Sequence, residues 1–396
     1  MNPLRIKHLR KENISVPKKY VIYWMQQAQR VKYNHALEHA ISIANKLNLP
    51  LLVFFGLTSN YPEANQRHYR FMLEGLKEVK DALNSLGISF VLKYGSPKET
   101  ILPLLSDANT LVMDKGYLKE PRAWRKSIIA YAIKNELSIN IDIVDTDLIV
   151  PVEVASNKVE YRAYTLRPKI KKIYRQFIDF SVLTPIKNKK AINIDSSDSL
   201  EKLDQTIINL NLAQTLSPSK FYRGGYSQAS KLLDNFIEHK LNHYLESNDP
   251  SLDYTSKLSM YLHFGQISSL EILNRITIAK DKGEVNKEQY EAFVEQLLIR
   301  RELAFNYVYY HQGYDQFETM TEPWAYKTME EHQNDSRPYI YSREDIEKFK
   351  THDSYFNAAM KEMVITGYMP NYMRMYWAKK IIEWTSTYKK AYETIC

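Results

Sequence analysis

The sequence has almost no cysteine. Its 396 residues contain a single one, Cys396, at the last position. One thiol cannot build a disulfide framework within the chain or a cysteine-based metal site, and such scarcity is typical of a reducing intracellular compartment. The histidine and carboxylate residues show no spacing characteristic of metal ligands. We therefore expect a cytoplasmic protein that holds no metal.

Long apolar runs and glycine-rich phosphate motifs are also missing. The basic first 20 residues lack the apolar segment of a secretion signal, and no later stretch has the length of a membrane span. No GxGxxG or Walker A sequence follows a predicted strand, so the usual loops that bind dinucleotides or ATP are not supported. The sequence predicts no membrane partner.

Positive charge and aromatic side chains are abundant instead. The formal net charge is +8, and the chain contains 30 Tyr, 14 Phe and 5 Trp residues. Cationic groups beside planar side chains suit a partner that carries both phosphates and stackable bases. A biased, lysine-rich composition would give the same numbers without any such partner, so composition leaves both interpretations open.

In the first part of the chain, short apolar runs alternate with helical patterns. We predict strands at residues 20–24, 51–57, 88–92, 110–113 and 139–144, and helices at 32–47, 66–86, 98–105 and 122–134. Gly87 suits the C-terminal cap of the second helix. This alternation predicts an α/β domain over residues 1–150, with a doubly wound parallel sheet covered by helices on both faces.

The rest of the chain is predicted to be a linker and an all-α domain. Periodicity weakens between residues 145 and 200, and we assign residues 151–215 to an interdomain linker. We interpret its basic segment 161–175 as a solvated helix face rather than a nucleic-acid contact, and its segment 188–200 is polar. Residues 216–396 show helical patterns at 226–244, 270–280, 287–310, 342–349, 352–365 and 372–393.

Residues 255–270 form the segment around which we expect the site to be organised. Three hydroxyl side chains, Thr255, Ser256 and Ser259, precede an apolar and aromatic run. Hydroxyls and unpaired N–H groups at a helix start can hold a phosphate, although most such starts only cap their helix.

Two further patterns are candidates for chemistry. Glu302, Phe305 and Tyr309 share one helix face, where a carboxylate among aromatics suits a site but is equally explained by pairing with Arg300 or Arg301. Trp377 and Trp384 are seven residues apart, about 10 Å along a helix. Indoles at that separation can relay electrons, although such a stripe is more often core packing.

The sequence resembles the class II cyclobutane pyrimidine dimer photolyases of the photolyase/cryptochrome superfamily. The segments that carry the resemblance are residues 23–37, 66–79, 159–170, 258–268, 300–303, 351–363 and 372–384, in the family's order. The resemblance implies an N-terminal α/β antenna domain, a C-terminal helical domain that binds FAD, and light-driven repair of UV-damaged DNA. It leaves open whether a second, antenna chromophore binds and whether that chromophore is a deazaflavin or a folate. We expect a monomer.

The resemblance assigns roles to individual residues. Tyr244, Asn371, Arg374 and the segment Thr255, Ser256, Lys257, Leu258 and Ser259 would bind FAD. Glu302 would hydrogen-bond the damaged bases, with Arg301, Phe305 and Tyr309 as further DNA contacts. Trp377 and Trp384 would carry electrons to the photoexcited, oxidised flavin.

This chain departs from the family at several positions. Phe356 and Met360 stand where the family usually has Trp and Gln, Met260 replaces a usual Pro, and an Arg common before Asn248 is absent. The family normally continues past the helix that ends near Trp384, so we expect a helical domain that is short at its C-terminus. Two alternatives follow: a flavin-binding, cryptochrome-like photoreceptor or damage-binding protein without repair activity, and a remnant that binds neither ligand.

Overall fold

The computed structural model describes residues 1–179, 183–196, 200–212 and 216–396. Among these residues, six strands form one sheet in the order β1-β6-β5-β2-β3-β4. The strands are β1 (Ile6–Arg10), β2 (Tyr20–Trp24), β3 (Leu51–Leu57), β4 (Ser89–Tyr94), β5 (Ala108–Asp114) and β6 (Asn140–Val144). The strands β2 to β6 are parallel, whereas β1 pairs antiparallel with β6. The predicted parallel sheet is confirmed, and the antiparallel edge strand β1 was not predicted.

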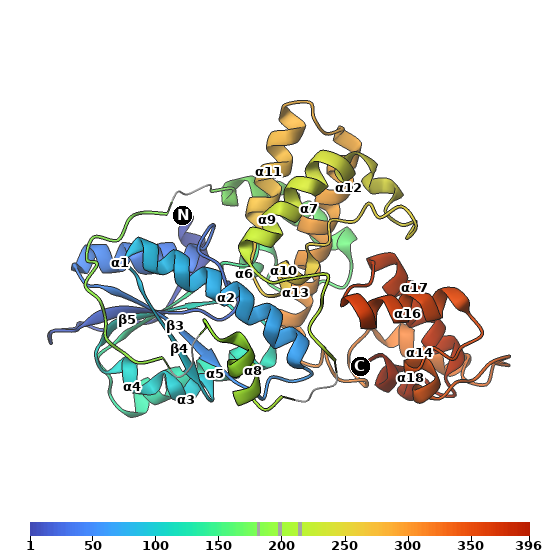
Figure 1. Cartoon of the computed structure of the whole chain (residues 1–396), viewed down its shortest axis with the longest axis horizontal. Coiled ribbons are helices and arrows are strands. Elements are labelled where there is room, and N and C mark those ends of the chain that lie inside the picture. Colours follow the sequence, from blue (N-terminus) through green and yellow to red (C-terminus); the bar gives the residue numbers. More distant parts are fainter. Residues whose placement is uncertain (180–182, 197–199, 213–215) are drawn as a thin grey trace.

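Helices cover both faces of the sheet, as predicted (Figure 1). Val21 and Tyr23 of β2 pack into a core with α1 (His35–Leu47) and α2 (Gln66–Leu86). The alternate β2 residues Tyr20, Ile22 and Trp24 pack on the other side, against a core that includes side chains of α4 (Leu102–Leu105) and α5 (Lys119–Lys134). Because successive strand residues point to opposite faces, a wholly apolar strand supplies both cores.

The helix α2 has the predicted boundaries. Asn65 caps its start by accepting a hydrogen bond from the Arg67 N–H, and Gly87 follows its end with φ +78°. Glycine suits this left-handed conformation because it has no Cβ. The short helix α3 (Pro97–Thr100) and α4 together replace the single helix predicted at 98–105.

A second core unites the helices that follow the sheet domain. It includes buried side chains of α7 (Ala163–Ile173), α9 (Tyr226–Asn235), α11 (Ser269–Asp281), α12 (Lys287–Val294) and the π-helical turn η5 (Glu295–Arg300). The chain continues directly from η5 into α13 (Arg301–Tyr310). Leu166 and Ile170 of α7 are buried in this core, so this part of the proposed linker lies within the helical body. Residues 180–182, 197–199 and 213–215 of that linker lie outside the described residues.

Shorter helices lie in both the sheet domain and the helical region. They are η1 (Pro3–Arg5), α6 (Val152–Ala155), η2 (Tyr174–Phe177), α8 (Leu203–Asn209), η3 (Phe236–Lys240), η4 (Leu241–Glu246) and α10 (Ser259–His263). None of the helices in the described parts of the chain combines the length and the apolar character that crossing a membrane requires.

The last helices form a group of their own (Figure 1). They are α14 (Pro323–Glu331), α15 (Arg343–Glu347), α16 (Ser354–Thr366), α17 (Asn371–Trp384) and α18 (Tyr388–Ile395). Side chains from α15 to α18 share a small hydrophobic core around Phe356, Ile381 and Trp384. The helix predicted at 372–393 is divided, because α17 ends at Trp384 and Thr387 caps the start of α18.

Candidate functional site

A cavity of about 1130 Å³ lies where the sheet domain meets the helical regions. The sheet domain contributes the carboxyl ends of two parallel strands, with Trp24 at the end of β2, Met25 directly after it, and Phe55 to Leu57 from β3. The carboxyl edge of a parallel sheet is the usual position of a ligand site in such folds. The helical regions contribute η5, α13 and the segment that leads into α17. Residues distant in the sequence therefore meet around one volume.

All eight residues predicted to bind the cofactor line this cavity. They are Tyr244, Thr255, Ser256, Lys257, Leu258, Ser259, Asn371 and Arg374. Arg301 and Phe305, two of the predicted DNA contacts, line it as well. The assignment of ligands to these side chains stays a prediction, whereas their convergence on the cavity is a property of the fold.

The hydroxyl-rich segment is not a capped helix start. Its helix α10 begins only at Ser259, and the Thr255 hydroxyl accepts a hydrogen bond of 2.9 Å from the Tyr368 hydroxyl instead. Lys257 has φ +55°, and its Nζ lies 2.8 Å from an Asp253 carboxylate oxygen. Burial alone would lower the pKa of Lys257, but the hydrogen bond to Asp253 holds it above its ordinary value. The segment thus presents a charged ammonium and three hydroxyl side chains to the cavity.

The cavity combines cationic and aromatic walls. Lys257, Arg300, Arg301 and Arg374 line it, and these cations suit a phosphate-bearing ligand. The Tyr61 and Trp124 rings, 6.2 Å apart in an edge arrangement, also line it. Such planar surfaces suit a flat heterocycle.

Two buried amides also line the cavity without satisfying their hydrogen-bonding capacity. Gln26 Nε2 and Gln29 Oε1 have no hydrogen-bond partner among the described residues. Unpaired buried polar atoms are costly, so a donor and an acceptor of this kind favour a polar ligand beside them. The cations and the free amide atoms together fit a polar, phosphate-bearing ligand such as FAD.

Glu302 is fully buried beside the cavity and is not among the described residues that line it. Its Oε1 accepts hydrogen bonds from the backbone N–H groups of Ile149 at 2.7 Å and Val150 at 3.2 Å. Burial raises the pKa of the carboxyl to about 8, although the Arg301 charge and the two backbone donors oppose this shift. Glu302 therefore retains a proton at neutral pH.

The arginines that were the alternative partners of Glu302 pair with other carboxylates. Arg301 Nη2 lies 3.1 Å from Asp147, and Arg300 Nε lies 3.6 Å from Glu295. Tyr309, predicted to share the Glu302 face, packs edge-on against Tyr117 with ring centroids 6.0 Å apart. It is not among the described cavity-lining residues.

The two predicted electron carriers lie in the last helical group, in α17. Trp384 is 1% exposed, and the Phe356 ring is stacked with that of Trp377 and edge-on to that of Trp384. Trp377 Nε1 points at the sulfur of Met360, the other position that departs from the family pattern. Neither indole is among the described residues that line the cavity.

Comparisons with known proteins agree with this architecture. The family model for DNA photolyase matches residues 21–189. Over 393 residues the sequence is 41% identical to a deoxyribodipyrimidine photo-lyase of Methanothermobacter thermautotrophicus, which covers 98% of this chain and 83% of the relative. The chain belongs to the DNA photolyase family. It is also 36% identical to the deoxyribodipyrimidine photo-lyase of Arabidopsis thaliana, over 92% of this chain and 74% of the relative.

Solved structures of the photolyase/cryptochrome fold superpose on this photolyase-family chain. A class III photolyase from Agrobacterium tumefaciens gives a TM-score of 0.71 at 18% identity, covering 96% of this chain and 76% of that one. A cryptochrome from Synechocystis gives a TM-score of 0.73 at 14% identity, covering 97% and 79%. At these identities the likeness concerns the fold, and it confirms the predicted α/β and helical architecture.

Sequence reasoning missed the segment Asp145–Val150 that joins β6 to α6. Three buried or nearly buried arginines, Arg5, Arg30 and Arg301, donate to its backbone carbonyl groups. The signal was present, since Asp145 and Asp147 directly follow a buried strand at the carboxyl edge of the sheet. Arg5 gave no such signal, because it stands in a basic N-terminal stretch that is typical of an exposed leader.

Proposed function

We propose that this chain is a deoxyribodipyrimidine photolyase, which uses light and FAD to split cyclobutane pyrimidine dimers in DNA. The observation that carries the proposal is the convergence of all eight predicted cofactor residues on one cavity of about 1130 Å³. The identity of 41% over nearly the whole chain to a deoxyribodipyrimidine photo-lyase supports it independently. We assign the chain to class II within the family from the motifs in its sequence.

The cavity residues divide into groups by their chemistry. Lys257, Arg374 and the hydroxyls of Thr255, Ser256 and Ser259 would hold the FAD phosphates, while Tyr244, Leu258 and Asn371 would shape the rest of its pocket. FAD, when bound and reduced, supplies on excitation the electron that splits the cyclobutane ring. At the sheet end, Tyr61 and Trp124 provide stacking surfaces for an antenna chromophore such as a deazaflavin or folate.

The substrate side is assigned to α13. Its residues Arg301 and Phe305 reach the cavity, where a dimer flipped out of the duplex would lie. Glu302, protonated at neutral pH, can donate a hydrogen bond to a base carbonyl once its side chain turns from Ile149 and Val150 toward the cavity. Such a donor stabilises negative charge that arrives on the dimer. Tyr309, at the end of the same helix, is assigned to the flanking DNA.

DNA binding itself would be largely electrostatic. The net charge of +8 and the cavity-lining arginines favour contacts to the phosphate backbone, which carry no sequence information and weaken as salt rises. We propose a cytoplasmic monomer that recognises UV damage through the extruded dimer rather than through the surrounding bases.

The test is repair of a UV-damaged oligonucleotide by the purified protein under blue light. Repair that requires both light and bound flavin is expected. Glu302→Ala should slow repair while leaving the flavin spectrum unchanged. If Glu302→Ala instead releases the flavin, the residue is structural and its assignment to the substrate is lost.

The same experiment distinguishes photolyase activity from the cryptochrome-like alternative. The Synechocystis cryptochrome has the same fold as this chain. A flavin-bearing protein that binds damaged DNA equally in light and dark without splitting dimers would support a receptor or damage-binding role. A colourless protein that binds neither ligand would support a remnant.

A further inference from the structure

Two consecutive peptide groups lie between the Arg5 guanidinium and the Glu302 carboxyl. Arg5 Nη1 donates to the carbonyl of Leu148 at 2.9 Å, and Nη2 donates to the carbonyl of Ile149 at 2.7 Å. The N–H groups of these same two peptide units, on Ile149 and Val150, donate to Glu302. Each peptide group is therefore hydrogen-bonded to a cation on its carbonyl side and to the carboxyl on its N–H side.

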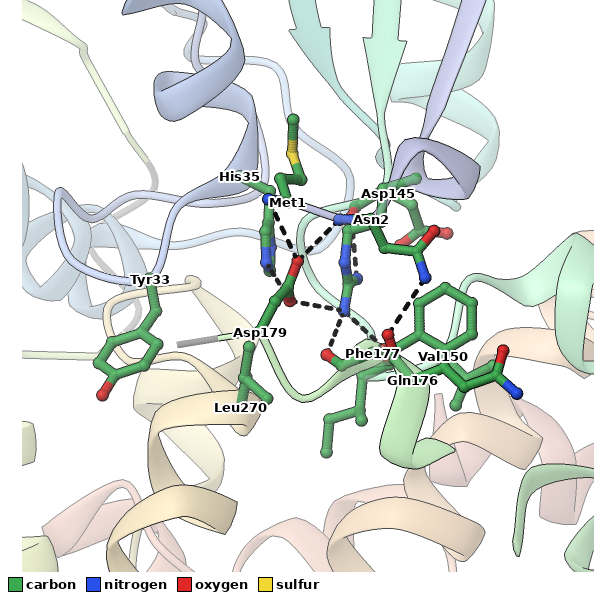
Figure 2. Close-up of polar contacts among 12 residues, drawn as sticks. Met1, Asn2, Tyr33, His35, Asp145, Val150, Gln176, Phe177, Asp179 and Leu270 are labelled. Carbon is green, nitrogen blue, oxygen red and sulfur yellow. Dashed lines mark hydrogen bonds and ion pairs between the residues drawn. The ribbon is translucent and has the colours of Figure 1, made fainter. Parts of the chain in front are cut away.

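Several further contacts hold the Arg5 side chain in this position. It is 2% exposed, and Nη2 also donates to the carbonyl of Phe177 at 3.0 Å. Asp179 lies 3.8 Å from Nη2 as a counter-charge, and it also accepts from the backbone N–H of Asn2 and pairs with His35 (Figure 2). These contacts join the N-terminus, α1 and the segment after η2 around one guanidinium.

Other ionisable groups also face Glu302. Arg301 precedes it on α13 and lowers its pKa, Asp145 at the end of β6 raises it, and the Tyr117 hydroxyl after β5 lies in the same buried cluster. Asp145 accepts a hydrogen bond of 2.6 Å from Tyr117 and lies 3.9 Å from Lys115. Arg5 differs from these groups because it acts on the same two peptide groups that hold the carboxyl.

We propose that Arg5 is a positioning residue for Glu302, acting through the Leu148–Ile149 and Ile149–Val150 peptide groups. This inference rests on the proposed function, in which Glu302 serves the substrate. Hydrogen bonds in a chain polarise one another, so a guanidinium on the carbonyl side makes each N–H a better donor. Arg5 thereby fixes the position of the Glu302 carboxyl and stabilises its anionic form.

Charge variants of this cluster have opposite expected effects on the carboxyl. Arg5→Gln removes the cation and raises the pH at which Glu302 titrates. Asp179→Asn leaves Arg5 in place without its counter-charge, so Glu302 titrates at lower pH. Asp179 is partly exposed, at 21% of its side chain, which favours folding of this second variant.

Arg30 offers a matched control. It is 1% exposed and donates to the carbonyl of Thr146 at 2.8 Å, on the same segment but on a peptide group that does not reach Glu302. Arg30→Lys therefore weakens the packing of the segment without touching the two linking peptide groups. A shift of the Glu302 titration midpoint in Arg30→Lys would measure the effect of loosening the segment Asp145–Val150 in general.

The experiment follows the infrared C=O band of the protonated Glu302 carboxyl against pH in the flavin-loaded full chain, assigned by its absence in Glu302→Gln. The expected midpoints are higher in Arg5→Gln, lower in Asp179→Asn and unchanged in Arg30→Lys, with the pH profile of dimer repair moving in step. A midpoint in Arg5→Gln equal to that of the wild type overturns the proposal, and so does an equal shift in Arg30→Lys.

Two further outcomes remain decisive. If Arg5→Gln does not fold, an unchanged midpoint in Asp179→Asn overturns the proposal and a lowered one supports it. If the wild type repairs no dimers while the midpoints shift as expected, the proposed function fails and the link between Arg5 and Glu302 stands.

Discussion

Phe356 stacks on the indole of Trp377, with ring centroids 6.3 Å apart and planes 8° from parallel. It also meets Trp384 edge-on, with ring centroids 5.0 Å apart. A ring that is much harder to oxidise than indole thus contacts both tryptophans. Phe356 stands where the family usually has Trp.

Phe356→Trp should speed photoreduction of the oxidised flavin, because an oxidisable ring would then connect Trp377 with Trp384. The measurement is the rate at which oxidised flavin absorbance is lost under blue light with an external reductant. Phe356→Leu, which removes the ring but keeps an apolar side chain, is the control and should give no acceleration. Equal rates in the wild type and Phe356→Trp would place this position outside the electron path.

The carboxyl of Glu302 should make the fold less stable as pH rises. Burial raises the pKa of the folded-state carboxyl from 4.5 to about 8. Between these values the unfolded chain has released a proton that the folded protein keeps, so the free energy of unfolding falls with increasing pH. Glu302→Gln lacks the titrating group and should lose this part of the slope in denaturant unfolding followed over that pH range.

Glu295 provides the control for this pH dependence. The hydrogen bond from Arg167 lowers the pKa of Glu295, so its contribution to stability is present above its ordinary pKa and is lost only as pH falls further. Glu295→Gln should therefore leave the slope above pH 4.5 as in the wild type. A slope that survives in Glu302→Gln would show that another group carries it.

Lys257→Gln should weaken flavin binding. The ammonium lines the cavity, and a hydrogen bond to a charged group contributes about 1.5–3 kcal/mol, which corresponds to roughly 10- to 100-fold in affinity. Fluorescence titration of the apoprotein with FAD measures the change. Lys280→Gln, which removes a lysine paired with Asp281 outside the lining residues, is the matched control and should bind FAD normally. Unaltered affinity in Lys257→Gln would remove Lys257 from the phosphate contacts.

Gly265→Ala should destabilise the fold where the helical region contacts the sheet domain. Gly265 has φ +64°, and an added Cβ would lie 2.0 Å from the backbone oxygen of Gln27 in the sheet domain. Backbone strain and overpacking together are expected to destabilise the fold by roughly 2–4 kcal/mol, measured by denaturant unfolding. Gly283→Ala has a similar φ of +78° with open space around the Cβ, so it should show only the strain, about 1 kcal/mol. Equal losses would mean that the contact with Gln27 can relax.

The local patterns of the sequence predicted the sheet domain well and the breaks between helices poorly. Two strands, 20–24 and 51–57, and the helix α2 have the predicted bounds. A wholly apolar strand and an amphipathic helix that ends at a glycine are determined by residues close together in the sequence, so local patterns suffice to predict them. The strand β1 was missed because it is a partly exposed edge with polar side chains. The π-helical turn η5 was missed because the spacing of apolar residues continues through it.

The convergence of the candidate cofactor residues on one cavity was predictable only through resemblance. The hydroxyl segment was a candidate phosphate site on its residues alone, but no spacing rule brings Tyr244 and Arg374 to the same volume. The contacts of Glu302 were not predictable in either way. They depend on Arg5 and on the peptide groups of the segment Asp145–Val150, which approach one another only in the folded chain.

The central claim is that the cavity holds a flavin that performs light-driven repair. The most direct measurement combines an absorption spectrum of the purified chain with the count of cyclobutane dimers remaining in a UV-damaged oligonucleotide after blue light or darkness. We expect a flavin spectrum and loss of dimers in the light alone. A chain that carries flavin yet leaves as many dimers in the light as in the dark would contradict the account.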